Sequence, residues 1–74
     1  MILNPSEALK AAQYNENKGY TLRQSFRIFD VVGVTNPWDS VHVSNKIADW
    51  QKAQGLNADG KVGNETAEKI AKLL

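Results

Sequence analysis

Three short segments of the chain each carry the pattern of a helix N-terminus, and this pattern constrains the fold more than any other feature. Asn4 can cap a helix that has Pro5 at its first position and Glu7 reaching back to the cap. Thr21-Leu22-Arg23-Gln24 is a second capping box, and Asn36-Pro37-Trp38-Asp39 repeats the first pattern. Starts this closely spaced leave room only for short helices, so we expect an all-α chain.

The caps and stop signals divide residues 1–74 into four expected helices. The first runs from Pro5 to a stop at Gly19, and the second starts at Leu22. Residues 29–34 are rich in β-branched side chains and interrupted by Gly33, which predicts a short or partly extended second helix. The third is expected from about 37 to 54 and the fourth over 64–74. The prediction is one domain, a small orthogonal bundle of three to four helices.

Apolar spacing indicates which faces of these helices are buried. Leu22, Phe26 and Phe29 follow one another at helical spacing, with Val32 one turn further. In the third helix the expected buried residues are Val43, Ile47 and Trp50, with Val41 and Ala48 beside them. In the fourth they are Ala67, Ile70, Ala71 and Leu74. Trp50 is expected at the centre of the core.

Composition excludes several classes of protein. The chain has 74 residues and a net charge of +1. Because it contains no Cys, it has no disulfides and no thiolate metal sites. Nucleic-acid binders usually carry a basic stripe, whereas here the two signs of charge are interspersed. No apolar run has the roughly 18 residues of a membrane span. No signal peptide is visible in the first residues. We expect neither a nucleic-acid nor a membrane partner.

The residues that usually carry catalysis are not grouped in the sequence. His42 is the single histidine and has no Cys or second His as a metal-binding partner. Asp39, Ser40 and His42 are too close in sequence to face one another on a helix. The carboxylates lie beside caps, turns or charged faces. We therefore expect no catalytic residue, no cofactor and no metal.

The segment before the last helix combines turn residues with apolar side chains. Asp59-Gly60 indicates a tight turn, in which Gly60 takes a positive φ. Leu56 and Val62 flank the turn and can point into the core. Gly63 then opens the last helix, with the Thr66 hydroxyl expected near the free amides of its first turn.

The same segment resembles the repeat of the peptidoglycan-binding-like family. The matching positions are Trp50-Gln51, Gly55-Leu56, Asp59-Gly60, Gly63 and Thr66. Two departures are that Asn64 stands where the family usually has Pro, and that the earlier Asp-Gly copy of the repeat is absent. The resemblance implies a bundle of three main helices that serves as a non-catalytic, cell-wall targeting module of hydrolases.

This resemblance also implies a ligand and a location. The partners would be peptidoglycan or its muropeptide fragments and an attached catalytic domain. The chain would act as a monomer in the cell envelope, the periplasm, the extracellular space or a phage. Binding sugar faces and N-acetyl or peptide groups needs flat aromatic area with amides and hydroxyls. The side chains that offer these groups outside the expected core are Tyr20, Asn36, Trp38, Asn57, Lys61 and Asn64.

Two alternatives stay open on the sequence alone. Tyr20 and Trp38 can instead close the ends of the bundle as packing residues. The same fold can also serve as a protein-protein docking module of a phage particle or secretion apparatus.

Calcium is expected to leave the melting temperature unchanged. The sequence around Asp59-Gly60 is similar to a calcium loop, but its alignment puts Gly55 at the first ligand position and Thr66 at the last, where carboxylates are required. Thermal denaturation with and without millimolar calcium checks this, and a rise of several degrees would contradict it.

Overall fold

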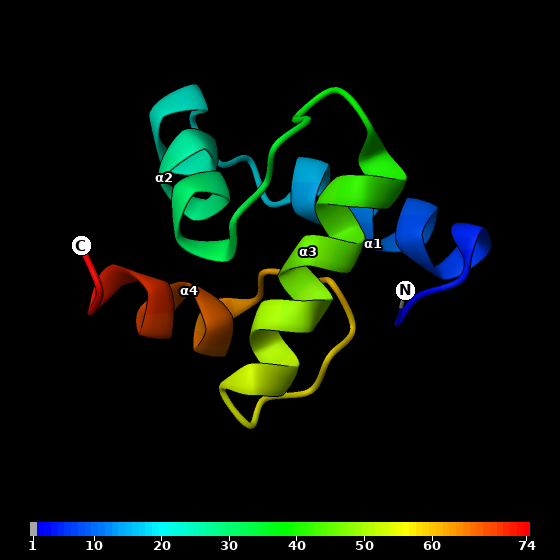
Figure 1. Cartoon of the computed structure of the whole chain (residues 1–74). Helices are drawn as coiled ribbons and strands as arrows, with labels where there is room; N and C mark the ends of the chain where they lie inside the picture. Colours follow the sequence, from blue (N-terminus) through cyan, green and yellow to red (C-terminus); the bar gives the residue numbers. More distant parts are fainter. Residues whose placement is uncertain (1) are drawn as a thin grey trace.

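Four α-helices make up the fold of residues 2–74, the part of the chain that the computed structural model describes (Figure 1). The helices are α1 (Pro5–Asn17), α2 (Leu22–Val32), α3 (Ser40–Ala53) and α4 (Asn64–Ala71). These residues contain no strand, so the expected all-α bundle of up to four helices is confirmed.

The first two helices start where the capping boxes place them. At α1, the Glu7 amide donates to Asn4 Oδ1 at 2.8 Å and the Asn4 amide donates to Glu7 Oε1 at 3.1 Å. At α2, the Gln24 amide donates to Thr21 Oγ1 at 3.1 Å and the Thr21 amide to Gln24 Oε1 at 2.9 Å. Each pair satisfies two amides that lack partners within the helix.

The third helix starts at Ser40, so the expected start near Pro37 was wrong. The Asp39 carboxylate accepts from the amides of Val41 at 3.1 Å and His42 at 3.2 Å, and this makes Asp39 the cap. Asn36 Oδ1 instead accepts from the Trp38 amide at 3.2 Å, which closes a turn before the helix. Asn36 and Asp39 are both residues that cap helices well. Because the Asn36 side chain is used in the turn, Asp39 is the N-cap of α3.

The second helix is regular up to Val32 and ends at Gly33, which has a φ of 81°. The expectation of a partly extended segment here was wrong. Its buried residues are Ile28 and Val32, whereas Leu22 and Phe26 are exposed and Phe29 is half-buried. The helix therefore packs through a different face from the one that Leu22 and Phe26 share.

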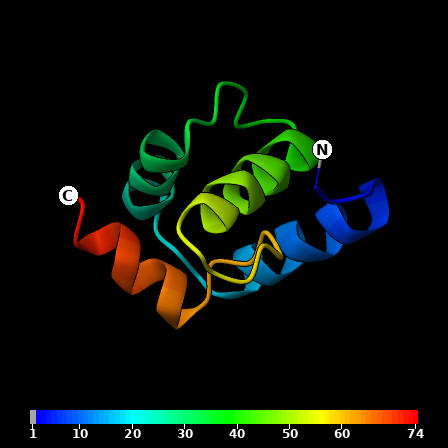
Figure 2. The same cartoon turned by 60° about the horizontal axis from the view of Figure 1, so that its bottom comes forward.

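Helix α3 lies between α1 on one side and α2 and α4 on the other (Figure 2). Ile47 packs with one buried cluster, formed with Ile28, Val32, Val62 and Ile70. Its neighbour Ala48 packs with a second cluster, formed with Leu3, Ala8 and Ala11. Consecutive residues of one helix thus enter both halves of the core.

Helices α1 and α3 approach each other through small side chains. Ala8 and Ala48 are fully buried, and the Ser44 hydroxyl donates to the Ala8 carbonyl oxygen at 2.7 Å. The Leu3 amide donates to Asn45 Oδ1 at 2.8 Å, which fixes the entry to α1. These contacts place the polar side chains of Ser44 and Asn45 in a tightly packed interface, where their hydrogen bonds offset the cost of burial.

Some expected core residues of α3 and α4 are also placed differently. Trp50 is half-buried and packs against the first cluster, whereas the residues at its centre include Ile47. Ala71 and Leu74 are exposed because α4 ends at Ala71 and buries only its face around Thr66 and Ile70. An eight-residue helix has room for one apolar stripe of about two turns.

The connection from α3 to α4 turns back along α3. Gly55, with a φ of 74°, ends α3, and the Leu56 amide donates to the Gln51 carbonyl oxygen at 2.9 Å. Gly60 also has the expected positive φ, 75°, and is buried. A Cβ atom at Gly60 would lie 2.8 Å from Leu3 Cδ1 and 3.0 Å from the Ser44 carbonyl oxygen. The connection thus packs directly between α1 and α3.

Gly60→Ala is expected to destabilise the protein more than Gly55→Ala. Both glycines have nearly the same φ, 75° and 74°, so the left-handed backbone costs each variant about 1–2 kcal/mol. A Cβ at Gly55 meets nothing within 4 Å, whereas one at Gly60 must displace Leu3 or the α3 backbone, which adds about 1–3 kcal/mol. Urea denaturation of the two variants measures the difference, and equal losses would contradict the close packing at Gly60.

Candidate functional site

The amide side chain of Gln51 holds the α3–α4 connection from inside the protein. Gln51 is 1% exposed, and its Oε1 accepts from the Gly60 amide at 2.9 Å. Its Nε2 donates to the Lys61 carbonyl oxygen at 2.9 Å and to Thr66 Oγ1 at 3.1 Å. Thr66 was expected to serve the first turn of α4, but α4 has no side-chain cap, and the Thr66 hydroxyl accepts from Gln51 instead.

A second amide, from α1, holds the same connection from the other side. Asn15 Nδ2 donates to the Gly60 carbonyl oxygen at 2.9 Å, and Asn15 Oδ1 accepts from the Val62 amide at 2.6 Å. The Tyr20 hydroxyl donates to the Val62 carbonyl oxygen at 2.5 Å. Burial, and then the neighbouring Tyr14, raise the pKa of Tyr20 above its usual value. Tyr20 therefore has a structural role through its hydroxyl.

A groove of about 300 Å³ lies between α1, α2 and the start of α3. We call it the Tyr20 groove. Its lining combines an apolar floor with amide, hydroxyl and carboxylate groups: Ala12, Asn15, Glu16, Tyr20, Ser25, Ile28, Phe29, Pro37, Ser40, Val43, Ile47 and Val62. Such a mixture suits a ligand that has both apolar and hydrogen-bonding faces.

Two other candidate residues flank Pro37 at the edge of the Tyr20 groove. Trp38 is 89% exposed, so its indole makes little contact with the rest of the protein. Asn36 is also exposed, and its side-chain oxygen accepts from the Trp38 amide. The structure thus brings Tyr20 and Pro37 to the same groove, with Asn36 and Trp38 on either side of Pro37 in the chain, an arrangement that the sequence did not predict.

The remaining candidates lie together in a second hollow, of about 260 Å³, beside the α3–α4 connection. Asn57, Lys61 and Asn64 line it, and so does Tyr14, which the sequence analysis missed. Lys61 Nζ lies 5.6 Å from the centroid of the Tyr14 ring. Lys18 Nζ donates to Asn64 Oδ1 at 3.2 Å. We call this the loop hollow.

A signal for Tyr14 exists in the sequence. Tyr14 and Lys18 lie four residues apart on α1, so both point toward the same side of that helix. The spacing does not show that Gly63 lies next to the Tyr14 hydroxyl: a Cβ at Gly63 would be 3.3 Å from that oxygen.

The groups considered for catalysis have structural partners. His42 Nε2 accepts from the Thr35 amide at 3.1 Å, and the Asp39 carboxylate caps α3. Within residues 2–74, no three His, Asp or Glu side chains are grouped as metal ligands would be. None of the helices in this range has the length and apolar character needed to cross a bilayer.

Comparison with known protein families gives one match. The model of a family described as "Putative peptidoglycan binding domain" matches residues 29–70. This stretch contains the end of α2, all of α3, the α3–α4 connection and most of α4. It therefore includes Gln51 and the groups that its side chain binds in Gly60, Lys61 and Thr66, which we call the Gln51 network. No curated protein and no solved structure matches the chain significantly.

Gln51→Leu is expected to destabilise the fold by more than about 2 kcal/mol. It leaves the Gly60 amide and the Lys61 carbonyl without their buried partner, and each such group costs about 1–3 kcal/mol. Urea denaturation measures the loss, and faster hydrogen exchange at the Gly60 amide locates it. Asn57→Ala, an exposed change on the same connection, is the control and should stay within about 0.5 kcal/mol of wild type. A Gln51→Leu variant as stable as that control would contradict the role of the network.

Proposed function

The chain belongs to the peptidoglycan binding domain family, and we propose that it is a non-catalytic module that attaches to the bacterial cell wall. The family match supports wall binding in general. The family is described as a binding domain, and this description supports a non-catalytic role.

We place the main contact with the wall at the Tyr20 groove and the adjoining 36–38 turn. The observation that carries this placement is the exposure of Trp38, at 89%, in a chain with few large side chains to spare for its core. A free indole offers a flat apolar face, on which the ring of a sugar can lie. Tyr20 forms a wall of the groove, and the side chain of Asn36 lies beside Trp38.

The loop hollow would supply a second set of contacts. Asn57 and Asn64 offer amide groups, and the Lys61 ammonium contacts the uncharged ring of Tyr14. Its charge is therefore available to a ligand that has carboxylates, as the peptide part of peptidoglycan does.

In this proposal the single domain over 1–74 works as a monomer and brings an attached hydrolase, or an envelope or phage component, to the wall. The site of action would be the cell envelope, the periplasm, the extracellular space or a phage particle. The +1 net charge supports a ligand that is not strongly charged.

One observation favours the second candidate, a protein docking module. An apolar hollow of about 210 Å³ lies between α2 and α4, and its lining includes Ile28, Ala67, Ile70 and Leu74. Leu73, which precedes Leu74 in the chain, is 60% exposed. Apolar surface of this kind is common where proteins associate.

Trp38→Ala is expected to abolish co-sedimentation with purified insoluble peptidoglycan while the fold stays intact by circular dichroism. The exposed indole contributes little to the core, so its loss should affect ligand contact alone. Leu9→Ala, which removes another exposed apolar side chain, is the control and should sediment like wild type. Unchanged sedimentation of Trp38→Ala would move the site to the loop hollow. A wild-type protein that does not sediment at all would favour the docking module.

A further inference from the structure

Phe26 lies beside the Tyr20 groove with much of its ring free. It is 46% exposed, although its spacing from Leu22 and Phe29 predicted a buried stripe. Its ring meets that of Phe29 edge to face, with 6.1 Å between centroids and 90° between planes. Phe29 lines the groove, so the pair forms a continuous aromatic surface from the groove to the outside of α2.

The contact with Phe29 favours one orientation of the Phe26 ring. Perpendicular aromatic pairs at this separation stabilise each other beyond the effect of the area they bury. A ring that is already fixed loses little conformational freedom when a ligand covers it. Phe26 therefore has two properties of a binding platform, an accessible face and an orientation that its contact with Phe29 favours.

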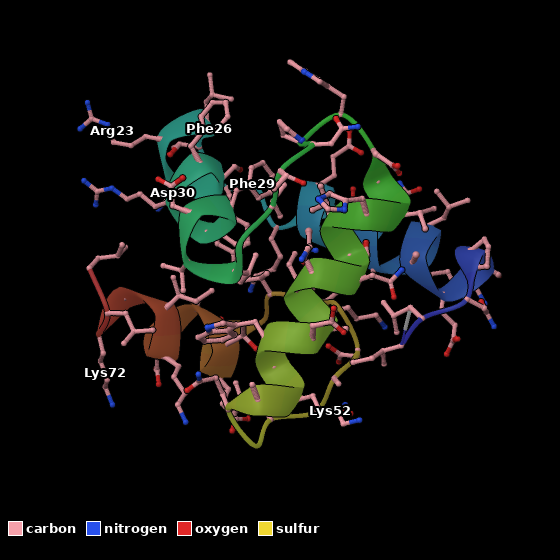
Figure 3. The ribbon with its side chains drawn as sticks, in the orientation of Figure 1. Arg23, Phe26, Phe29, Asp30, Lys52 and Lys72 are labelled. Carbon is pink, nitrogen blue, oxygen red and sulfur yellow. The ribbon has the colours of Figure 1, made fainter. Side chains whose placement is uncertain are left out.

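One charged residue of α2, Arg23, points away from this surface (Figure 3). In Figure 3, Arg23 points away from the connection between α2 and α3, whereas Phe29 lies on the side of that connection. The groove itself has a single charged group among its lining residues, the carboxylate of Glu16. Its other polar groups include the hydroxyls of Ser25 and Ser40, which can both donate and accept hydrogen bonds.

We propose that Phe26 is a second aromatic platform of the Tyr20 groove, and that the groove binds the N-acetylated glycan strand of the wall rather than its peptide. This inference rests on the proposed function. The apolar faces of sugar rings match Phe26 and Trp38, and sugar hydroxyls match Ser25 and Ser40. The wall peptide carries carboxylates, and the groove has no cationic side chain among its lining residues to bind them.

An NMR titration of the ¹⁵N-labelled chain with two probes tests the ligand class. The probes are a β-1,4-linked N-acetylglucosamine tetrasaccharide and a wall stem peptide without sugar. The tetrasaccharide is expected to shift the Trp38 indole signal and the amides of Ser25 and Phe26. The stem peptide is expected to leave these signals unchanged. Groove signals that respond to the peptide and not to the tetrasaccharide would overturn the assignment to glycan.

Variants of Phe26 test the platform itself. Phe26→Ala is expected to weaken tetrasaccharide binding about tenfold, and Phe26→Tyr, which keeps the ring, is expected to retain wild-type affinity. Leu9→Ala, which removes a side chain that is 55% exposed and lines neither the Tyr20 groove nor the loop hollow, is the control for loss of an exposed apolar side chain. Wild-type affinity in a Phe26→Ala variant that is folded by circular dichroism would overturn the platform.

Sedimentation with insoluble peptidoglycan separates this inference from the proposed function. A wild-type chain that sediments but shows no shifts with the tetrasaccharide contradicts glycan binding and leaves wall binding in place. A chain that binds the tetrasaccharide but does not sediment supports the glycan groove and contradicts attachment to the wall.

Discussion

The buried amide of Gln51 satisfies backbone groups that the α3–α4 connection brings into the core. Gly60 lies against Leu3 and the α3 backbone, too deep for water to serve its amide. A side-chain amide has the same donor and acceptor as a peptide group, so Gln51 can take the place of a neighbouring strand or helix turn. A hydrophobic residue of equal size would fill the space and leave these groups unpaired.

The candidate surfaces depend on this network because the connection contributes to both. Val62, whose amide and carbonyl are bound by Asn15 and Tyr20, lines the floor of the Tyr20 groove. Lys61 and Gly63, the residues before and after Val62, line the loop hollow. The same hydrogen bonds that complete the core therefore fix the relative positions of the two surfaces, and a ligand that spans both would meet a pre-formed arrangement.

Much of the fold could be predicted because its signals are local. A capping box lies within four residues, so Asn4 and Thr21 specify helix starts without reference to the rest of the chain. The start of α3 was misplaced because Asn36 and Asp39 are both suitable caps, and propensity does not decide between them. The candidate site was predicted only in part. Tyr20, Asn36 and Trp38 were named from their chemistry, but Tyr14 and Phe26 were missed because their exposure depends on how the helices pack.

The sequence alone determined the helical class, most helix starts and the repeat around Asp59-Gly60, because each depends on residues that are neighbours along the chain. The tertiary structure decided which aromatic side chains are free. Trp50 and Trp38 are equally apolar, yet Trp50 packs against the core and Trp38 is almost wholly exposed. Helical spacing gives the angle between side chains on one helix, but the direction of the core is set by the other helices. For α2 that direction is given by Ile28 and Val32, and this leaves Phe26 at the edge of the groove.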